Sequence, residues 1–568
     1  MPIEKHLKRL RAQLAYPKIS IQLSILGLLA GLCASAFIIL FRWCLDNIQM
    51  LYLDVPDDFT SLEPHIRFIL PFIGAGIIAL VGIFTQFKHF RLGIPFVIYR
   101  LKIFYGMMPI RNTINQFFGG IMAMGSGFSV GREGPAVHLG AGAASYFAAW
   151  LKLPYNSVRT LSACGMAAAI SASFNTPLAA VIFVMEVVLR EYKTHIFVPV
   201  MLASVTGALA NRLVFGHAHD LGGLEINVLG IQHYPYLVFM GLLIGCLSFA
   251  FNRQLLEIIR SFRSVNMLVR LLLAALITAI IGYLVPQALG TGLGAIYVAQ
   301  ANIDNAQLLM TIFIAKAALT LFAIGLGVPG GIIGPILGLG MMVGTLLALI
   351  ASIFIGNIGE YSDTYGVLGL AALMAACLNA PLAALVTALE MTYNPEVIAP
   401  AMVVVVSAYV ISYQLFRNRS LFLLQLELQK LDYHIPPTYD ILQKTGVQAA
   451  MDKQFILVTT DDEETIKNAL DRAGKHPVIL KQQNQDGCAF MRVSYDVSLD
   501  PNNAVPYRLE ELQGVESRYT LAEPYEILQQ KRQGSVYIFE EELDNIIGVL
   551  SWHQLRLRLT NGHFKEFE

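Results

Sequence analysis

The chain has 568 residues, of which 55% are hydrophobic and 14% are charged, and its formal net charge at pH 7 is +0. Soluble globular proteins carry about 25% charged residues, so this composition excludes an ordinary soluble protein and indicates that most of the chain faces a lipid bilayer. The neutral balance gives no sign of a nucleic-acid or acidic partner. The six cysteines form no CxxC motif or His/Cys cluster, so we expect neither a metal site nor a disulfide framework.

Residues 1–19 form a basic, amphipathic segment, which the positive-inside rule places in the cytoplasm. Apolar runs follow at residues 21–41 and 68–84 and recur to about residue 416. These runs approach or reach the ~20 residues that a membrane-spanning helix needs. We therefore predict a polytopic α-helical membrane domain over residues 20–430, in the cell membrane.

Two pairs of matching motifs occur in the same order in the two halves of this domain. The pairs are GFSVGREGP (127–135) with GVPGGIIGP (327–335), and FNTPLAAVIFVMEV (174–187) with LNAPLAALVTALEM (378–391). Paired halves are typical of transporters that bind their substrate at the interface between two repeats. We predict repeats over about 20–215 and 235–430.

Proline within these apolar motifs predicts helices that start inside the membrane, because proline suits the first turn of a helix. The four predicted starts are Pro135, Pro177, Pro335 and Pro381. A helix start attracts anions through its unpaired N–H groups, so the four starts together predict one anion site. The alternative is that these glycines and prolines only allow close helix packing.

Arg132 and Glu133 are adjacent charges within one of these motifs. A charge at bilayer depth costs at least ~2.5 kcal/mol and needs a partner, a cavity or a function. Glu133 directly precedes a Gly-Pro helix start, so its carboxylate can occupy the N–H donors that would otherwise hold an anion. Protonation would release it, which predicts a gate; the alternative is an acid that only caps a helix. Arg132 either fixes the loop or adds positive potential.

The chain resembles the CLC family of chloride channels and chloride/proton antiporters. The motifs that carry the resemblance are GREGP (131–135), FNTPLAA (174–180), GGIIGP (330–335) and LEMT (389–392), and it covers about residues 20–430. It implies a CLC-type inverted repeat with interrupted helices, a homodimer with one anion pathway per subunit, and a gating glutamate at Glu133. The implied function is transport of chloride or a similar small anion, not enzyme catalysis.

The resemblance also implies which residues bind the anion. They are Leu92, Gly93, Gly131, Arg132, Gly134, Gly331, Ile332, Ile333 and Phe422. Leu92 and Phe422 stand where the family has a serine and a tyrosine, so two hydroxyl donors are missing. Losing a neutral donor weakens binding by about 0.5–1.5 kcal/mol, and the loss of both is expected to relax anion selectivity.

Val187 stands where the antiporters of the family have a second carboxylate, the internal proton acceptor. Protons either reach Glu133 through water, or Glu186 or another acid replaces that group. Channel-like and proton-coupled transport therefore both remain open. A non-conducting membrane sensor that signals through its tail is the alternative function. His138 is expected to be packed or water-facing rather than a ligand.

Residues 431–568 have a soluble composition and repeat a strand–helix–strand plan at 455–480 and 517–539, with Thr460 or Asp461 as a helix cap. This cytoplasmic tail resembles a paired CBS module. Some such pairs bind adenine nucleotides through an acid at a position that Gln554 occupies here, so a structural or dimer-stabilising tail is the alternative, and no cofactor is expected. Lys88, His89 and Arg91 predict a basic cytoplasmic loop, an electropositive vestibule, or both.

Overall fold

The computed structural model describes residues 2–18, 20–86, 92–216, 224, 226–301, 305–355, 359–484, 487–495 and 507–561. Lys88, His89 and Arg91 lie outside the described residues, so the predicted basic loop stays a prediction. The chain forms two compact units. The membrane unit comprises Ser24–Phe147 and Arg159–Tyr433, and the tail unit comprises Met1–Leu23, Ala148–Val158 and His434–Glu568.

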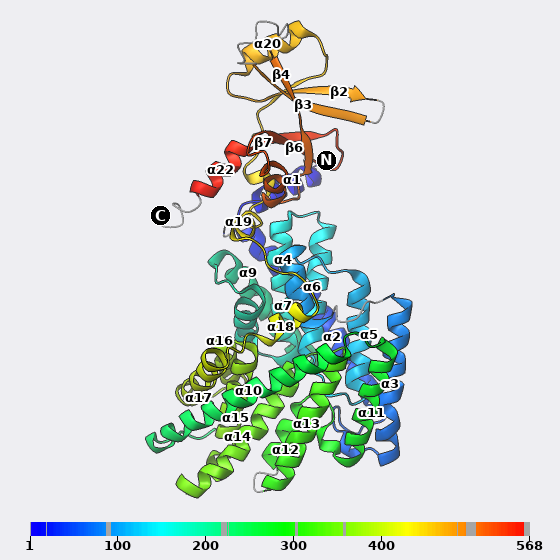
Figure 1. The fold of residues 1–568 in the computed structure, drawn as a ribbon, viewed down its shortest axis with the longest axis vertical. Helices are drawn as coiled ribbons and strands as arrows, with labels where there is room; N and C mark the ends of the chain where they lie inside the picture. Colours follow the sequence, from blue (N-terminus) through cyan, green and yellow to red (C-terminus); the bar gives the residue numbers. More distant parts are fainter. Residues whose placement is uncertain are drawn as a thin grey trace. The chain divides into compact units, whose positions relative to one another are not determined.

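The membrane unit is helical, and its helices fall into two successive sets (Figure 1). The first set is α2 (Ile21–Gln49), α3 (Pro64–Phe84), α4 (Gly93–Ile103), α5 (Ile110–Gly125), α6 (Glu133–Trp150), α7 (Tyr155–Phe174), α8 (Pro177–Phe183), the π-helical η2 (Val184–Leu189) and α9 (Thr194–Phe215). Short 3₁₀ turns of the membrane unit are η1 (Phe59–Ser61), η3 (Ile231–His233), η4 (Pro286–Ala288), η5 (Gly359–Tyr361) and η6 (Pro395–Val397), and the tail unit contains η8 (Val447–Ala449).

The second set follows the first along the chain. It is α10 (Tyr234–Phe262), α11 (Met267–Leu284), α12 (Leu293–Ala301), α13 (Ala306–Leu326), α14 (Ile333–Ile355), α15 (Ser362–Leu378), α16 (Pro381–Thr392), α17 (Ile398–Val410), the π-helical η7 (Ile411–Leu415) and α18 (Leu421–Leu428). Among the described residues, 8 helices are long and apolar enough to cross a membrane. The prediction of a polytopic helical domain is confirmed.

The matching Asn-x-Pro motifs end one helix and begin the next. Asn175 and Asn379 adopt positive φ angles of 55° and 57°, a left-handed conformation that asparagine tolerates and that terminates α7 and α15. Pro177 and Pro381 then occupy the first turns of α8 and α16, where the missing N–H has no intrahelical partner to lose. The sequence repeat is therefore a repeat of helix breaks.

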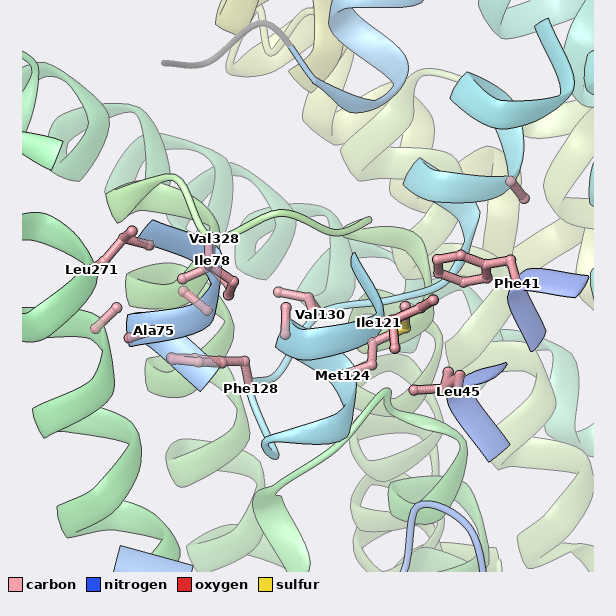
Figure 2. Close-up of a cluster of buried hydrophobic side chains, with 14 of the residues drawn as sticks. Phe41, Leu45, Ala75, Ile78, Ile121, Met124, Phe128, Val130, Leu271 and Val328 are labelled. Atoms are coloured by element: carbon pink, nitrogen blue, oxygen red, sulfur yellow. The ribbon is translucent and has the colours of Figure 1, made fainter. Parts of the chain in front are cut away.

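The segment that leads into α6 is anchored in a buried apolar cluster (Figure 2). Phe128 and Val130 are both 0% exposed. They pack among side chains of α2, α3, α5 and α11, including Phe41, Ile78 and Leu271. Because lipid is as apolar as these side chains, close packing rather than transfer from water holds such a cluster together. The position of Glu133 is therefore fixed by the main chain that precedes it.

The tail unit contains two small sheets. The first has the order β1 (Ile456–Val458), β2 (Val478–Asn484), β3 (Gly487–Tyr495) and β4 (Tyr507–Glu511), and the second has the order β5 (Gln513–Glu516), β6 (Ser535–Phe539) and β7 (Ile546–Ser551). In each sheet the first two strands are parallel and are joined by a helix, α20 (Glu463–Ala473) or α21 (Ala522–Leu528). The remaining helices are α1 (Pro2–Leu14), α19 (Pro437–Leu442) and α22 (Trp552–Asn561). The predicted α/β tail is confirmed.

The predicted cap of α20 was off by one or two residues. Asp462, and not Thr460 or Asp461, is the N-cap, and its side chain accepts a hydrogen bond from Thr465 N at 3.2 Å. Threonine and aspartate both cap helices well, so residue type alone does not decide which of the three positions is the N-cap. The position depends on where the preceding strand ends, at Val458.

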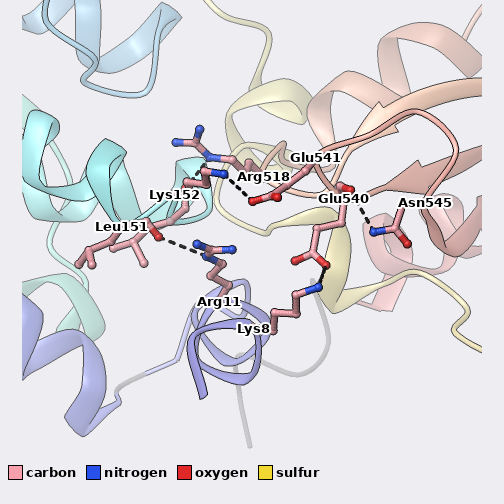
Figure 3. A network of polar contacts seen from close by, with 9 residues as sticks. Lys8, Arg11, Leu151, Lys152, Arg518, Glu540, Glu541 and Asn545 are labelled. Atoms are coloured by element: carbon pink, nitrogen blue, oxygen red, sulfur yellow. Dashed lines mark hydrogen bonds and ion pairs between the residues drawn. The ribbon is translucent and has the colours of Figure 1, made fainter. Parts of the chain in front are cut away.

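The tail unit also includes the N-terminal helix and the turn between α6 and α7 (Figure 3). Lys8 of α1 pairs with Glu540 at 2.8 Å, and Lys152 of the turn pairs with Glu541. Arg11 Nε donates to Leu151 O at 3.2 Å. Main-chain bonds add to these contacts, since Gly446 N donates to Ala15 O at 2.8 Å. The sequence did not predict this association.

Candidate functional site

The two Gly-rich segments of the repeats meet in a short antiparallel bridge. Gly131 N donates to Gly331 O at 2.7 Å, and Gly331 N donates to Gly131 O at 2.6 Å. A Cβ atom at Gly134 would lie 2.6 Å from Gly330 O, so a side chain there would force the two main chains apart. Glycine is therefore required, and the first turns of α6 and α14 lie next to each other.

Glu133 fills the space that these glycines leave open. Its side chain is 5% exposed. A Cβ atom at Gly131 would lie 2.0 Å from Glu133 Oε2, and one at Gly334 would lie 2.9 Å from Glu133 Oε1. The carboxylate therefore lies between the starts of α6 and α14, where the partial positive charges of both helices favour a negative group.

One side of this junction faces a cavity of about 70 Å³, here named the glycine cavity. Its lining residues are Leu92, Gly93, Ile94, Pro95, Gly134, Ile259, Ile324, Gly327, Val328, Pro329, Gly330, Gly331, Ile332, Phe422, Gln425 and Gln429. The structure thus brings together most of the residues that the sequence placed around an anion. Gly93 N is already bonded to Gln116 Oε1 at 2.9 Å, so that amide is occupied.

A second cavity, of about 40 Å³, has Glu133 in its wall and is otherwise almost wholly apolar. Ile333, which the sequence placed at the anion, lines this cavity and not the glycine cavity. Thr176 and Thr387 also line it. Glu133 is therefore in the wall of this second cavity, whereas its neighbour Gly134 is in the wall of the glycine cavity.

Arg132 borders a third cavity, of about 570 Å³. Its guanidinium carbon lies 4.8 Å from the centroid of the Phe174 ring. Asp57 lines the same cavity and accepts hydrogen bonds from Thr291 N at 2.9 Å and from Thr291 Oγ1 at 2.8 Å. Arg132 thus adds positive charge to a wide cavity, and it is not among the residues that line the glycine cavity.

The starts of α8 and α16 are occupied by carboxylates from the opposite repeat. Glu390 accepts hydrogen bonds from Leu178 N at 2.9 Å and Ala179 N at 2.7 Å. Glu186 accepts them from Leu382 N at 3.2 Å and Ala383 N at 2.7 Å. The prediction that four helix starts converge on one anion was therefore wrong for these two, because their N–H donors already bind protein carboxylates.

Residues 81–413 match the family model described as voltage gated chloride channel. The chain belongs to the voltage-gated chloride channel family. The chain is 30% identical over 405 residues to the H(+)/Cl(-) exchange transporter ClcA of Salmonella agona (strain SL483). This alignment covers 68% of the present chain and 83% of the relative. The protein is thus a multi-pass membrane protein of the CLC family, and its relatives are transporters rather than enzymes.

Solved CLC structures share the fold. A slow cyanobacterial Cl⁻/H⁺ antiporter aligns with a TM-score of 0.65 and 23% identity over 73% of this chain and 99% of that chain. A eukaryotic CLC transporter aligns with a TM-score of 0.58 and 20% identity over 94% of this chain and 97% of that chain. The likeness to the CLC fold therefore extends beyond the membrane unit.

Of the three predicted proton-path residues of this CLC protein, Glu133 begins α6, and Glu186 and Val187 lie on η2. Val187 is 5% exposed, and Glu186 caps α16 as described above. Among the described residues, Glu186 is not part of the wall of any of the three cavities near Glu133. The structure thus assigns Glu186 a capping contact. Its role in proton movement stays a prediction.

Sequence reasoning missed Lys316, which is 0% exposed in the middle of α13. Lys316 Nζ donates to Gly290 O at 2.7 Å and to Leu289 O at 3.2 Å, and its charge interacts with Asp57. The sequence did contain a sign of this residue, because a lysine within an apolar 21-residue helix stands out. A charge at membrane depth needs a partner or a function.

His138 is 0% exposed, and its ring stacks on Phe96 with a centroid distance of 5.8 Å. This packing agrees with the expectation of a packed histidine. Among the described residues, no group of three or more His, Cys, Asp or Glu side chains is arranged to hold a metal ion.

Proposed function

We propose that this protein transports chloride or a similar small anion and that Glu133 gates the pathway. The observation that carries the proposal is the place of the Glu133 carboxylate, between two helix starts and beside the glycine cavity. An anion that reaches this junction competes with the carboxylate for the same positive field. Protonation of Glu133 removes that competition, which links anion passage to protons.

The test is a flux assay in liposomes that reads chloride and pH together, on wild type and Glu133→Gln. Glutamine keeps the shape of a protonated glutamate and cannot release a proton. We expect the variant to conduct chloride with altered pH dependence and to move no protons. Glu396→Gln, at an exposed glutamate, is the matched control and keeps wild-type behaviour.

The same assay separates the two transport modes. Uphill proton movement that an imposed chloride gradient drives in the wild type identifies a proton-coupled transporter, as in the relatives named exchange transporters. Chloride flux without proton movement identifies a channel, and Val187 favours this mode because no second carboxylate stands there. Absence of chloride flux in wild type and variant alike would support the alternative, a non-conducting sensor.

We also propose a homodimer in the cell membrane with both termini in the cytoplasm. The basic N-terminal helix supports the orientation through the positive-inside rule. The shared compact unit of α1 and the tail supports the same side for the tail. Cysteine labelling with an impermeant reagent in intact cells tests the orientation, and native mass spectrometry tests the dimer.

For the CBS-like tail we propose a structural role without a bound nucleotide. Gln554 Oε1 accepts hydrogen bonds from Ser551 N at 2.8 Å and from Ser551 Oγ at 3.1 Å, which caps α22. A side chain held in this way is not free to bind a ribose. Equilibrium dialysis of the full chain against ATP or AMP should show no saturable binding, and saturable binding would reverse the proposal.

A further inference from the structure

Gln425 is a buried polar side chain in the wall of the glycine cavity. It follows Phe422 by three residues on α18, so both lie on the same face of that helix. Gln425 is 6% exposed. In the part of the chain that the structure describes, its carboxamide makes no side-chain hydrogen bond. The carboxamide lies in the wall of the cavity, so its N–H groups can donate to a ligand there.

The rest of the wall offers an anion little besides main chain. The neighbouring side chains Leu92, Ile332 and Phe422 are apolar. Two of the glycine N–H groups in the wall are already bonded, Gly331 N to Gly131 O and Gly93 N to Gln116 Oε1, so neither is available to an anion. An anion that leaves water for this cavity needs hydrogen-bond donors to offset its lost hydration. Gln425 supplies two N–H donors from one neutral group.

We propose that the carboxamide of Gln425 donates a hydrogen bond to the anion in the glycine cavity and helps to set its affinity and selectivity. This inference rests on the proposed function. A neutral donor suits a transport site, because binding must be favourable enough for an anion to enter and weak enough for it to leave. Gln429 lies one turn further along the chain, is half-buried, and lines the same cavity.

The test compares chloride binding to the purified full chain by isothermal titration calorimetry, together with chloride flux in liposomes. Gln425→Met keeps the length of the side chain and removes its donors. We expect its chloride Kd to rise about threefold to tenfold, the range that one lost neutral hydrogen bond produces. The ratio of nitrate to chloride affinity should change with it.

Two further variants keep the test decisive. Gln425→Asn retains the amide on a shorter stem, so its Kd should lie between those of wild type and Gln425→Met, which a purely structural role does not predict. Gln232→Met, at an exposed glutamine outside the cavity, is the matched control and should bind as wild type does. Size-exclusion profiles in detergent verify that each variant is folded.

The outcomes distinguish this inference from the proposed function. If wild type binds and moves chloride while Gln425→Met keeps its Kd and its nitrate to chloride ratio, the inference about Gln425 is overturned and the function stands. If wild type neither binds nor moves chloride or nitrate, the proposed function itself fails.

Discussion

At the scale of single residues, Arg132 and Glu133 are neighbours in the chain that border different cavities. Side chains at adjacent positions of a helix start point apart, so the glutamate turns toward the glycine junction and the arginine toward the wide cavity that Asp57 lines. The Gly-Pro motif predicted the helix start, which the structure shows, whereas the gate at Glu133 stays a prediction. The sequence could not predict the cavities, because Asp57 and Thr291 come from distant parts of the chain.

Lys316 and Asp57 provide a prediction at this scale. Lys316→Met removes the donor to Leu289 O and Gly290 O and the positive charge near Asp57, and leaving buried acceptors unpaired costs about 1–3 kcal/mol. The variant should therefore unfold at a lower temperature in detergent than wild type, as measured by thermal denaturation.

The double variant Lys316→Met with Asp57→Asn is the control for this prediction. Because it leaves no unpaired charge, it should recover part of the lost stability. A double variant whose loss equals the sum of the two single losses would show that the two side chains do not stabilise each other.

At the scale of elements, the repeats are joined by an exchange of helix caps. Glu186 caps α16 and Glu390 caps α8, each from the opposite repeat. The sequence predicted the starts of α8 and α16 correctly from Pro177 and Pro381. The sequence could not predict the caps of these two helices. Thr176 and Ala380 precede the helices without capping them, and the carboxylates that do so come from far along the chain.

The symmetry of these caps makes Glu390 a matched control for Glu186. Each Glu→Gln change removes a charge at a helix start and should destabilise the protein by about 0.5–2 kcal/mol, measured by thermal unfolding. If Glu186 only caps a helix, Glu186→Gln and Glu390→Gln should have equal effects on proton flux in the liposome assay. Loss of proton flux in Glu186→Gln alone would contradict a pure capping role and identify a proton relay.

At the scale of the whole molecule, composition and motif repeats predicted the helical membrane domain and the α/β tail. They did not predict that α1 and the α6–α7 turn would pack with the tail. Apolar periodicity marks which residues leave water, whereas this association depends on single pairs such as Lys8 with Glu540, and pairing between distant charged residues leaves no local pattern.

Charge reversal tests this association. Lys8→Glu and Glu540→Lys should each loosen α1 from the tail, and the double reversal should restore the contact because it rebuilds the pair with opposite polarity. A partly exposed ion pair contributes about 0.2–1 kcal/mol, so the effect is modest and should shrink at high salt. Hydrogen exchange of residues 2–14 in the full chain measures it, and equal exchange in both single variants and wild type would rule the contact out.

The same contacts fix how the tail unit responds to pH. The hydrogen bond with Glu540 raises the pKa of Lys8 above its ordinary 10.5, so the stability from that pair is complete below 10.5 and is lost as pH rises through the higher value. The hydrogen bond with Lys152 lowers the pKa of Glu541 below 4.5, so its contribution is complete above 4.5 and is lost as pH falls through the lower value. Between these limits both pairs stay charged. The difference in exchange of residues 2–14 between wild type and Lys8→Met, corrected for intrinsic rates, should therefore be constant from about pH 6 to 8, where neither Lys nor Glu titrates, and a steep change in that difference would contradict the assignment of these two pairs.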